Sequence, residues 1–245
     1  MDTVKVKSGK TLMIAHRGLS GLETENTCAA FVAAGNRPSY YGIETDIHRT
    51  SDGNFIIHHD PDTSRVGGKK LKVEETDFST LQEFRLRDKD GSHTRADLRL
   101  PSLEEYIGIC KRYGKTSVLE LKSAFTEEEI REMIGRIEKI GWLSEVIFIA
   151  FDYENLVKVR KVKPEQRCQF LTERFSETLL TRLVKDNIDL DIYYPALSEK
   201  DLKLCHENGV LVNVWTVDKK ADAERLIGWG VDFITSNILE GEVEP

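Results

Sequence analysis

Strand-like and helix-like segments alternate along the whole chain, and this order constrains the fold more than any other feature. Eight runs of apolar and β-branched residues have the length and composition of buried strands, at residues 12–15, 40–47, 117–122, 145–151, 167–171, 190–194, 210–217 and 231–235. Between them we expect helices at about residues 26–35, 102–113, 127–140, 155–162, 177–185, 199–207 and 219–229. Eight strands in strict strand-then-helix order, in 245 residues, predict a single TIM (β/α)₈ barrel.

A doubly wound open sheet would show the same alternation, so features at the strand ends must separate the two folds. After the first strand, His16-Arg17-Gly18 lacks the G-x-G-x-x-G spacing of a dinucleotide-binding loop. Polar residues instead follow several different strands, which suits the mouth of a barrel. Residues 239–245 are too few for a full eighth helix, so closure of the barrel is inferred from the repeat. We expect one domain over residues 1–245.

The second predicted strand is separated from its helix by a long stretch rich in charge, glycine and aspartate, residues 53–100. Within it we expect a short extra strand at residues 54–58, after the Asp52-Gly53 turn, and a short helix at residues 81–84. The loops at the carboxyl ends of barrel strands usually build the active site. We therefore expect this insertion to lie on the top face of the barrel.

Composition argues against several classes of function. The chain has 35 Lys and Arg against 42 Asp and Glu, a formal net charge of −7, whereas nucleic-acid-binding domains are normally basic. No run of about 18 apolar residues is present, so we expect no stable membrane insertion. The first residues lack the apolar run of a signal peptide, which favours a cytoplasmic protein, although a mature exported chain would look the same. The four cysteines form no C-x-x-C pair and are expected to be reduced thiols.

Two carboxylates stand on the second predicted strand. Glu44 and Asp46 are two residues apart, so their side chains point to the same face, roughly 7 Å apart along the chain. Such a pair on an apolar strand is costly unless a positive charge lies between the carboxylates. A salt bridge is the common solution, and a divalent cation bound by carboxylate oxygens is the alternative. The nearby His16, Arg17 and His59 favour the cation and metal-assisted phosphate chemistry.

The third predicted strand adds another carboxylate, because Glu120 shares one strand face with Lys122. If the first three strands are neighbours, Glu120 converges with Glu44, Asp46 and His16 at the carboxyl end of the barrel. Three carboxylates suit a hard cation such as Mg²⁺ or Ca²⁺, and they make a poor zinc site without a cysteine nearby. We expect Glu44, Asp46 and Glu120 to bind one divalent cation, Mg²⁺ or Ca²⁺.

Short motifs follow one another along almost the whole chain. They are His16-Arg17-Gly18, Glu25-Asn26-Thr27, Glu44-Thr45-Asp46, Thr50-Ser51-Asp52-Gly53, His59-Asp60, Leu119-Glu120-Leu121-Lys122, Val214-Trp215-Thr216-Val217 and Gly230-Val231-Asp232. Each motif is weak alone, but their order and spacing are specific, and together they resemble the motifs of the glycerophosphodiester phosphodiesterase family. The chain departs from the family pattern at three positions: Thr24 replaces the proline of P-E-N-T, Ala150 a common serine, and Ser236 a common aspartate.

The resemblance implies a TIM barrel, a divalent metal, and hydrolysis of glycerophosphodiesters to glycerol 3-phosphate and an alcohol. It implies that His16 and His59 act as acid and base, with the 2-hydroxyl of the substrate attacking first to give a cyclic phosphate that water opens. Either histidine could start as the base. Adjacent strand residues face opposite sides, so the H-D motif favours His59 over His58. His48 lies on the strand face of the carboxylates and is a less favoured ligand or catalyst.

Three further residues are assigned to the substrate. The Arg17 guanidinium suits two phosphoryl oxygens at once, with a salt bridge to a carboxylate as the alternative. Lys122 would add positive charge where the phosphoryl oxygens become more negative. Trp215 shares the inward face of its strand with Asn213 and could pack on the glycerol, with a place in the core as the alternative.

Two other functions compete with hydrolysis of a small glycerophosphodiester. A lipid-directed phosphodiesterase, of lysophospholipase-D or sphingomyelinase-D type, would need an exposed apolar or aromatic loop near the mouth to meet a bilayer. Residues 60–100 are instead strongly charged. A non-catalytic barrel that only binds a ligand would usually have lost a metal ligand or a histidine, and none is missing. The sequence favours neither a particular head-group alcohol nor an oligomeric state.

Overall fold

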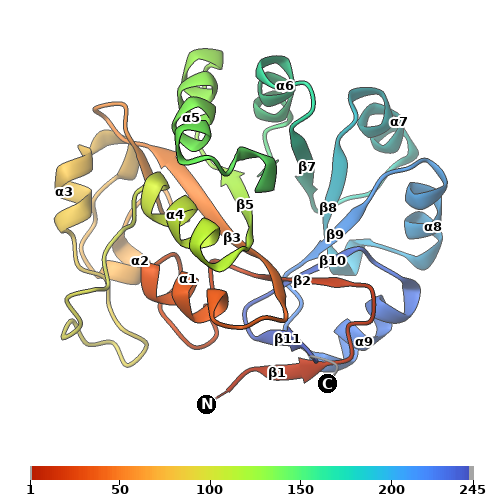
Figure 1. Ribbon diagram of the computed structural model, residues 1–245, viewed down its shortest axis with the longest axis horizontal. Helices are drawn as coiled ribbons and strands as arrows, with labels where there is room; N and C mark the ends of the chain where they lie inside the picture. Colours follow the sequence, from red (N-terminus) through yellow and green to blue (C-terminus); the bar gives the residue numbers. More distant parts are fainter. Residues whose placement is uncertain (1, 243–245) are drawn as a thin grey trace.

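Eight parallel strands close into a barrel in the computed structural model, which describes residues 2–242 (Figure 1). The barrel strands are β2 (Leu12–Ala15), β3 (Tyr40–Arg49), β5 (Thr116–Leu121), β6 (Val146–Ala150), β7 (Arg167–Thr172), β8 (Asp189–Tyr193), β9 (Val212–Trp215) and β10 (Phe233–Ser236). Each strand pairs in parallel with the next, and β2 pairs with both β10 and β3, which closes the ring. The predicted TIM barrel is therefore confirmed.

The outer layer consists of helices that follow the strands and surround them (Figure 1). They are α1 (Cys28–Gly35), α4 (Leu103–Tyr113), α5 (Glu127–Ile140), α6 (Tyr153–Val162), α7 (Glu177–Asp186), α8 (Glu199–Glu207) and α9 (Lys220–Trp229). Capping boxes at Ser102 and Thr126 start α4 and α5, because each side chain accepts a hydrogen bond from a backbone N–H that the helix cannot satisfy. Every barrel strand and outer helix lies within two residues of its predicted bounds.

Two short strands near the chain ends were not predicted. Strand β1 (Val4–Val6) pairs in parallel with β11 (Leu239–Gly241), and the two lie side by side close to both termini in Figure 1. Segment 239–241 thus extends from β10 as a strand where other repeats continue into a helix, and residues 243–245 lie outside the described part. Unlike Phe55–Ile57, neither segment is a run of apolar residues after a turn signal, so the sequence did not mark them as strands.

The insertion after β3 forms a lobe beside the barrel, on the left of Figure 1. It contains β4 (Phe55–Ile57), α2 (Ser64–Gly67), the 3₁₀ turn η1 (Val73–Glu75) and α3 (Phe78–Glu83). It has a small core of its own, made of Ile56, Val73, Leu81, Leu86, Leu98 and Leu100. Strand β4 runs antiparallel to the end of β3, and the N–H of His58 donates to the carbonyl oxygen of Asp46 at 3.0 Å. This pairing brings the residues after β4 to the carboxyl end of β3.

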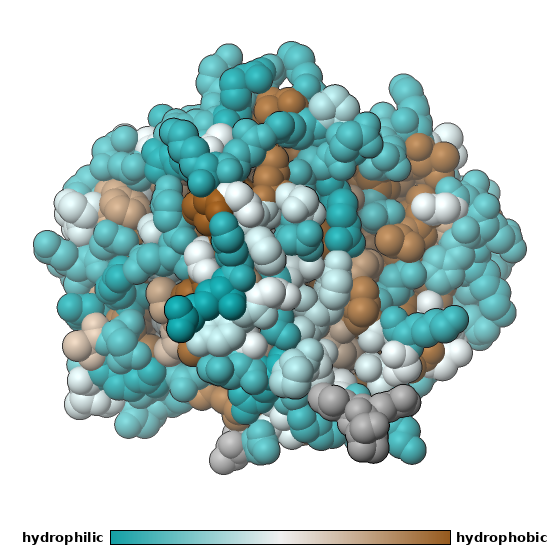
Figure 2. Space-filling view, viewed as in Figure 1, coloured by the Kyte–Doolittle hydropathy of each residue, from teal (hydrophilic) through white to brown (hydrophobic). Residues whose placement is uncertain are grey.

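The visible face of the molecule is mostly hydrophilic, with scattered hydrophobic patches (Figure 2). Among residues 2–242, no helix has the length and apolar character needed to cross a membrane.

Candidate active site

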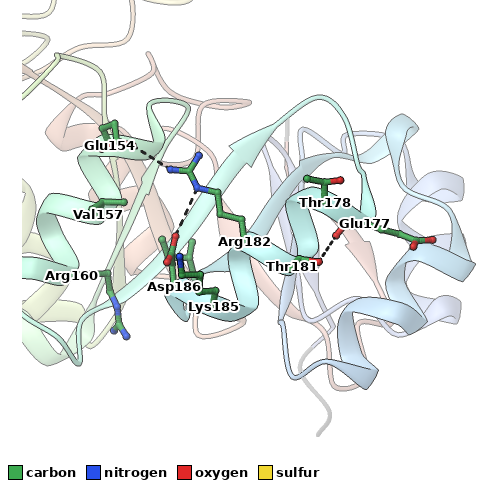
Figure 3. Close-up of a pocket in the computed structure, with 10 residues that line it drawn as sticks. Glu154, Val157, Arg160, Glu177, Thr178, Thr181, Arg182, Lys185 and Asp186 are labelled. Carbon is green, nitrogen blue, oxygen red and sulfur yellow. Dashed lines mark hydrogen bonds and ion pairs between the residues drawn. The ribbon is translucent and has the colours of Figure 1, made fainter.

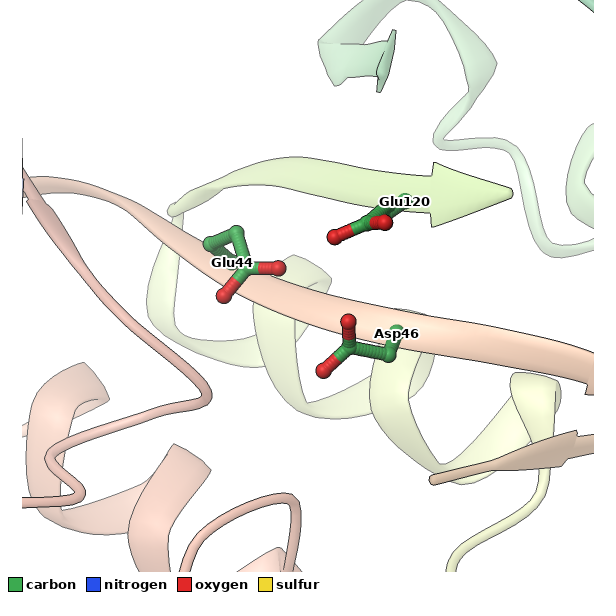
Figure 4. Close-up of side chains that lie close together, drawn as sticks. All are labelled: Glu44, Asp46 and Glu120. Atoms are coloured by element: carbon green, nitrogen blue, oxygen red, sulfur yellow. The ribbon is translucent and has the colours of Figure 1, made fainter. Parts of the chain in front are cut away.

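Three buried carboxylates meet at the predicted metal site. Glu44 and Asp46 on β3 and Glu120 on β5 point toward one another, and one oxygen of each lies within 4.8 Å of the others (Figure 4). The strand register explains this, because Asp46 stands directly beside Glu120 in the β3–β5 ladder. Their exposed fractions are 3%, 1% and 8%. The structure therefore brings together the residues that the sequence suggested as ligands.

The positively charged side chains of Arg17 and Lys122 lie at the edge of this acid cluster. Lys122 Nζ lies 2.8 Å from Oε1 of Glu120 and 3.7 Å from Oδ1 of Asp46. The other Asp46 oxygen, Oδ2, accepts a hydrogen bond from Nδ2 of Asn26 at 2.7 Å and lies 3.5 Å from Nε of Arg17. Oδ1 of Asp46 is buried and has no hydrogen-bond partner within the described chain.

The pKa values indicate that Arg17 and Lys122 do not neutralise all three carboxylates. Burial and the neighbouring Asp46 raise the pKa of Glu44 well above its usual value, and the same two causes raise that of Glu120 to about 7. Burial opposes ionisation of Asp46 as well, but the positive charge of Arg17 and other nearby groups outweighs it and lowers the pKa to about 2. Three close carboxylates with an unpartnered oxygen fit a hard divalent cation, which would let all three ionise.

His16 follows β2, and its ring is oriented by the side-chain amide of Asn237. Its Nδ1 lies 2.8 Å from Oδ1 of Asn237, and Nδ2 of Asn237 donates to Asp218 at 2.6 Å, which orients the amide. Nδ1 of His16 is therefore the protonated nitrogen when the ring is neutral, and Nε2 lies 3.9 Å from Oε2 of Glu44. Burial, with the charge of Arg17, lowers the pKa of His16 to about 4.

The two adjacent histidines after β4 have different surroundings. His59 is partly exposed, and its Nδ1 donates to Oδ1 of Asp60 at 2.7 Å, so Nε2 is the unprotonated nitrogen when the ring is neutral. His58 is buried, and its Nε2 lies 3.0 Å from the carbonyl oxygen of Asp62. The ring of His48 lies 3.2 Å from Oε1 of Glu74 and 3.3 Å from the carbonyl oxygen of His59, and its polar partners within residues 2–242 include neither the acid cluster nor Arg17. It supports the His59 backbone.

Arg17 has a backbone conformation that serves the site directly. Its φ of 54° is left-handed, and its N–H donates to Oε2 of Glu44 at 2.8 Å. The next residue, Gly18, also has positive φ, and a Cβ there would lie 2.6 Å from the backbone of Ala30. This close approach explains the glycine of the H-R-G motif. Nη1 of Arg17 donates to Glu25 at 2.9 Å, and Nη2 has no protein partner within residues 2–242.

Trp215 ends β9 and belongs to an aromatic wall with Phe151 and Tyr193, which follow β6 and end β8. The Trp215 ring centroid lies 5.6 Å from that of Phe151 and 5.5 Å from that of Tyr193. The indole N–H donates to the carbonyl oxygen of Asp191 at 3.3 Å. Phe151 and Tyr193 are among the most exposed large hydrophobic side chains, at 47% and 41%. The wall lies at the same end of the barrel as the acid cluster.

Two hollows differ in their relation to the predicted residues. A cleft of about 480 Å³ is lined by His59 and Lys122 together with residues of the insertion, including Lys70 and Lys72. A larger groove of about 810 Å³ runs between α6 and α7 on the outside of the barrel (Figure 3). Arg182 crosses that groove to Glu154, and none of its lining residues belongs to the predicted site. Of these two hollows, only the cleft beside His59 is lined by residues of the predicted site.

Several residues that support the site could not be assigned from sequence. Asn237 and Asp218 orient His16 from more than 200 residues away, and no local pattern marks them. Glu25 and Arg65 form ion pairs behind Arg17 and His59. Glu25 belongs to the segment that matches the P-E-N-T motif, so the motif singled the residue out. The motif did not indicate that Glu25 binds Arg17 and Arg65.

Comparisons with known proteins agree with this geometry. Residues 16–240 match the model of the glycerophosphoryl diester phosphodiesterase family. A glycerophosphodiester phosphodiesterase of Caldanaerobacter subterraneus subsp. tengcongensis is 32% identical over 237 residues, covering 93% of this chain and 94% of that protein. A glycerophosphodiester phosphodiesterase of Bacillus subtilis is 27% identical over 259 residues, with 93% and 84% covered.

Solved structures show the same relationship. An Oleispira antarctica phosphodiesterase, determined in complex with the product sn-glycerol-3-phosphate, superposes with a TM-score of 0.83 at 25% identity and covers 93% of both chains. A glycerophosphodiester phosphodiesterase of Parabacteroides distasonis gives a TM-score of 0.77 at 26% identity, also covering 93% of both chains. The resemblance noted in the motifs is thereby confirmed, and the chain belongs to the glycerophosphoryl diester phosphodiesterase family, whose members are phosphodiester hydrolases.

Proposed function

We propose that this protein hydrolyses glycerophosphodiesters to glycerol 3-phosphate and an alcohol, with one divalent cation and two histidines. The observation that carries the proposal is the meeting of three buried carboxylates with two oriented histidines and a partly free arginine at one end of the barrel. A buried ion-pair cluster built only for stability would not leave an unpartnered carboxylate oxygen beside two available imidazole nitrogens.

Glu44, Asp46 and Glu120 would hold the cation through carboxylate oxygens, and the donor set fits Mg²⁺ and Ca²⁺ alike. The bound cation would supply positive charge to the phosphoryl oxygens and lower the barrier to attack on phosphorus. Around it, Arg17 would bind the phosphoryl group through its free Nη2, and Lys122 would add charge from the neighbouring strand.

The histidines would move protons at their Nε2 atoms. One ring accepts the proton of the substrate's 2-hydroxyl as that oxygen bonds to phosphorus, and the other gives a proton to the departing alkoxide, so the alcohol leaves neutral. Water then opens the cyclic phosphate while the two rings exchange roles. The Nδ1 partners, Asn237 for His16 and Asp60 for His59, keep both Nε2 atoms toward the substrate. Trp215 would pack against the carbon skeleton of the glycerol.

A second function, hydrolysis of lysophospholipids, is favoured by the aromatic wall. Phe151 and Tyr193 present exposed rings at the barrel mouth, where an acyl chain could lie. The insertion offers no comparable surface, because Leu81 is buried in its small core and Phe78 and Phe84 pack against that core. We rank this function second because the hydrophilic insertion lies beside His59.

One assay separates these functions. The purified protein is given glycerophosphocholine and, separately, lysophosphatidylcholine, each with Mg²⁺, with Ca²⁺ and with excess EDTA. We expect metal-dependent release of glycerol 3-phosphate from glycerophosphocholine. Faster release of choline from lysophosphatidylcholine would establish the lipid-directed alternative. Failure to cleave any substrate of either class, with any metal, would indicate a binding protein.

A further inference from the structure

A chain of ion pairs outside the acid cluster connects two of the proposed functional groups. Nη1 of Arg17 donates to Oε1 of Glu25 at 2.9 Å, and Nδ1 of His59 lies 2.7 Å from Oδ1 of Asp60. Arg65 joins the two carboxylates: its Nη1 and Nη2 donate to Glu25 at 2.7 and 2.6 Å, and its Nε donates to Oδ2 of Asp60 at 2.6 Å. The guanidinium of Arg65 thus links Arg17 to His59 through the carboxylates of Glu25 and Asp60.

The connected residues come from separate parts of the chain. Glu25 lies in the loop between β2 and α1, Asp60 follows β4, and Arg65 belongs to α2 of the insertion. Both oxygens of Asp60 are used, one by His59 and one by Arg65, which fixes the rotation of the carboxylate. Both oxygens of Glu25 are likewise used, with Oε1 shared between the two arginines.

Stability alone is a weak explanation for this arrangement. The Arg65 side chain is 47% exposed, and ion pairs of exposed side chains add little to stability. Holding its long side chain in one rotamer also costs conformational entropy. What a guanidinium offers instead is geometry, because its N–H donors lie in one rigid plane and can orient two carboxylates at once. A lysine ammonium has no such plane.

We propose that Arg65 is a positioning residue for the reaction, a role that rests on the proposed function of the site. Through Asp60 it holds the His59 ring with Nδ1 protonated and Nε2 toward the substrate. Through Glu25 it holds one edge of Arg17, so that Nη2 stays turned to the phosphoryl group. The insertion therefore contributes to catalysis by fixing the relative placement of a proton donor or acceptor and a phosphate ligand.

The test compares Arg65→Lys and Arg65→Gln with a matched control. Arg95 lies in the same insertion and also donates hydrogen bonds to two carboxylates, from Nη1 to Glu23 at 2.7 Å and from Nη2 to Asp97 at 2.8 Å, with Asp88 3.7 Å from Nη1. It contacts none of the residues assigned to catalysis or binding. Arg95→Lys therefore measures how much stability and activity are lost when a guanidinium that does not contact the site is replaced. Melting temperature and circular dichroism are recorded for every variant.

Each variant is assayed for kcat and KM on glycerophosphocholine. We expect Arg65→Lys and Arg65→Gln to lower kcat by roughly 10- to 100-fold and to raise KM, the size of effect that lost support behind functional groups produces. Lysine should not rescue, because it keeps the charge and loses the fork. Arg95→Lys should keep both constants within about twofold. In Arg65→Gln combined with Asp60→Asn, kcat should fall much less than the product of the single losses, since both changes break one path.

Three results would overturn the proposal: near-normal constants in Arg65→Lys, losses in the double variant that multiply, or equal losses in Arg95→Lys. A wild-type protein that cleaves no glycerophosphodiester would instead overturn the proposed function. In that event ¹⁵N NMR of the His59 ring still decides on Arg65. We expect a single neutral tautomer with Nδ1 protonated in the wild type and a mixture in Arg65→Gln, and identical spectra would refute the link.

Discussion

Buried carboxylates occupy two regions of the barrel interior, and their surroundings differ. Glu44, Asp46 and Glu120, on β3 and β5, have Arg17 and Lys122 beside them. Across the barrel, on β8, Asp191 is 2% exposed. It stands beside Asn213 in the β8–β9 ladder, and Asn213 in turn contacts Gln169 and Thr235. Oδ1 of Asp191 has no hydrogen-bond partner within the described chain.

The difference lies in which acids can ionise. Burial and the nearby Glu120 raise the pKa of Asp191 well above its usual value; a contact with Asn213 opposes them, but no cation among residues 2–242 does. Asp46 is buried to the same degree, yet its pKa is lowered to about 2 because Arg17 and Lys122 are close. Burial alone therefore does not mark a functional acid. We regard the β3–β5 region as prepared for a cation and the β8 region as a neutral polar layer in the core.

The largest effect is expected from removing a carboxylate of the acid cluster. Glu120→Gln should abolish metal-dependent hydrolysis while the fold remains, because losing one of three close negative charges also relieves their repulsion. In the wild type, a cation at 100 times its Kd should stabilise the fold by about 2.7 kcal/mol. Thermal unfolding with and without Mg²⁺ or Ca²⁺ should show this rise in the wild type and its loss in Glu120→Gln. Full activity of the variant at low metal concentration would contradict the assignment.

The next effect concerns the histidines beside the acid cluster. A positioned acid or base contributes about 10²–10⁴-fold, so His16→Ala and His59→Ala should each lower kcat by at least that lower limit. His58→Ala serves as the matched control, because its ring is buried against the backbone of Asp62. The His58→Ala variant should have a lower melting temperature, while its kcat should stay close to that of the wild type. Inactive His58→Ala with active His59→Ala would mean that the sequence register at β4 is wrong by one residue.

The sequence predicted the barrel and its carboxylates because both follow local rules. Alternating strands and helices determine the barrel, and strand parity places Glu44 and Asp46 on one face. The sequence also favoured His59 over His58 by strand parity, but both residues lie after β4, so their different environments come from the loop and not from a strand. Contacts between distant segments follow no such rule. Arg65 reaches Glu25 across 40 residues, and Asn237 reaches His16 across 221, so these supports emerged only from the fold.

The smallest effect is expected from Asp191→Asn, which should change the pH dependence of stability and not activity. This variant tests most directly the difference between the β8 region and the acid cluster. In the unfolded chain the Asp191 carboxyl has its ordinary pKa near 3.8, and burial raises that pKa in the fold. Above about pH 4 the unfolded chain loses this proton while the folded chain keeps it, so the free energy of unfolding falls as pH rises toward the folded pKa. Asparagine cannot ionise, so the variant escapes this loss.

The variant should therefore become increasingly more stable than the wild type as pH rises from 3.5 toward 7, and at pH 3.5 the two should be nearly equal. Urea unfolding from pH 3.5 to 8, in EDTA, measures the difference. Activity and metal-induced stabilisation should be unchanged. A stability difference that does not vary with pH, or a large loss of kcat, would place Asp191 with the functional acids and remove the contrast between the two regions.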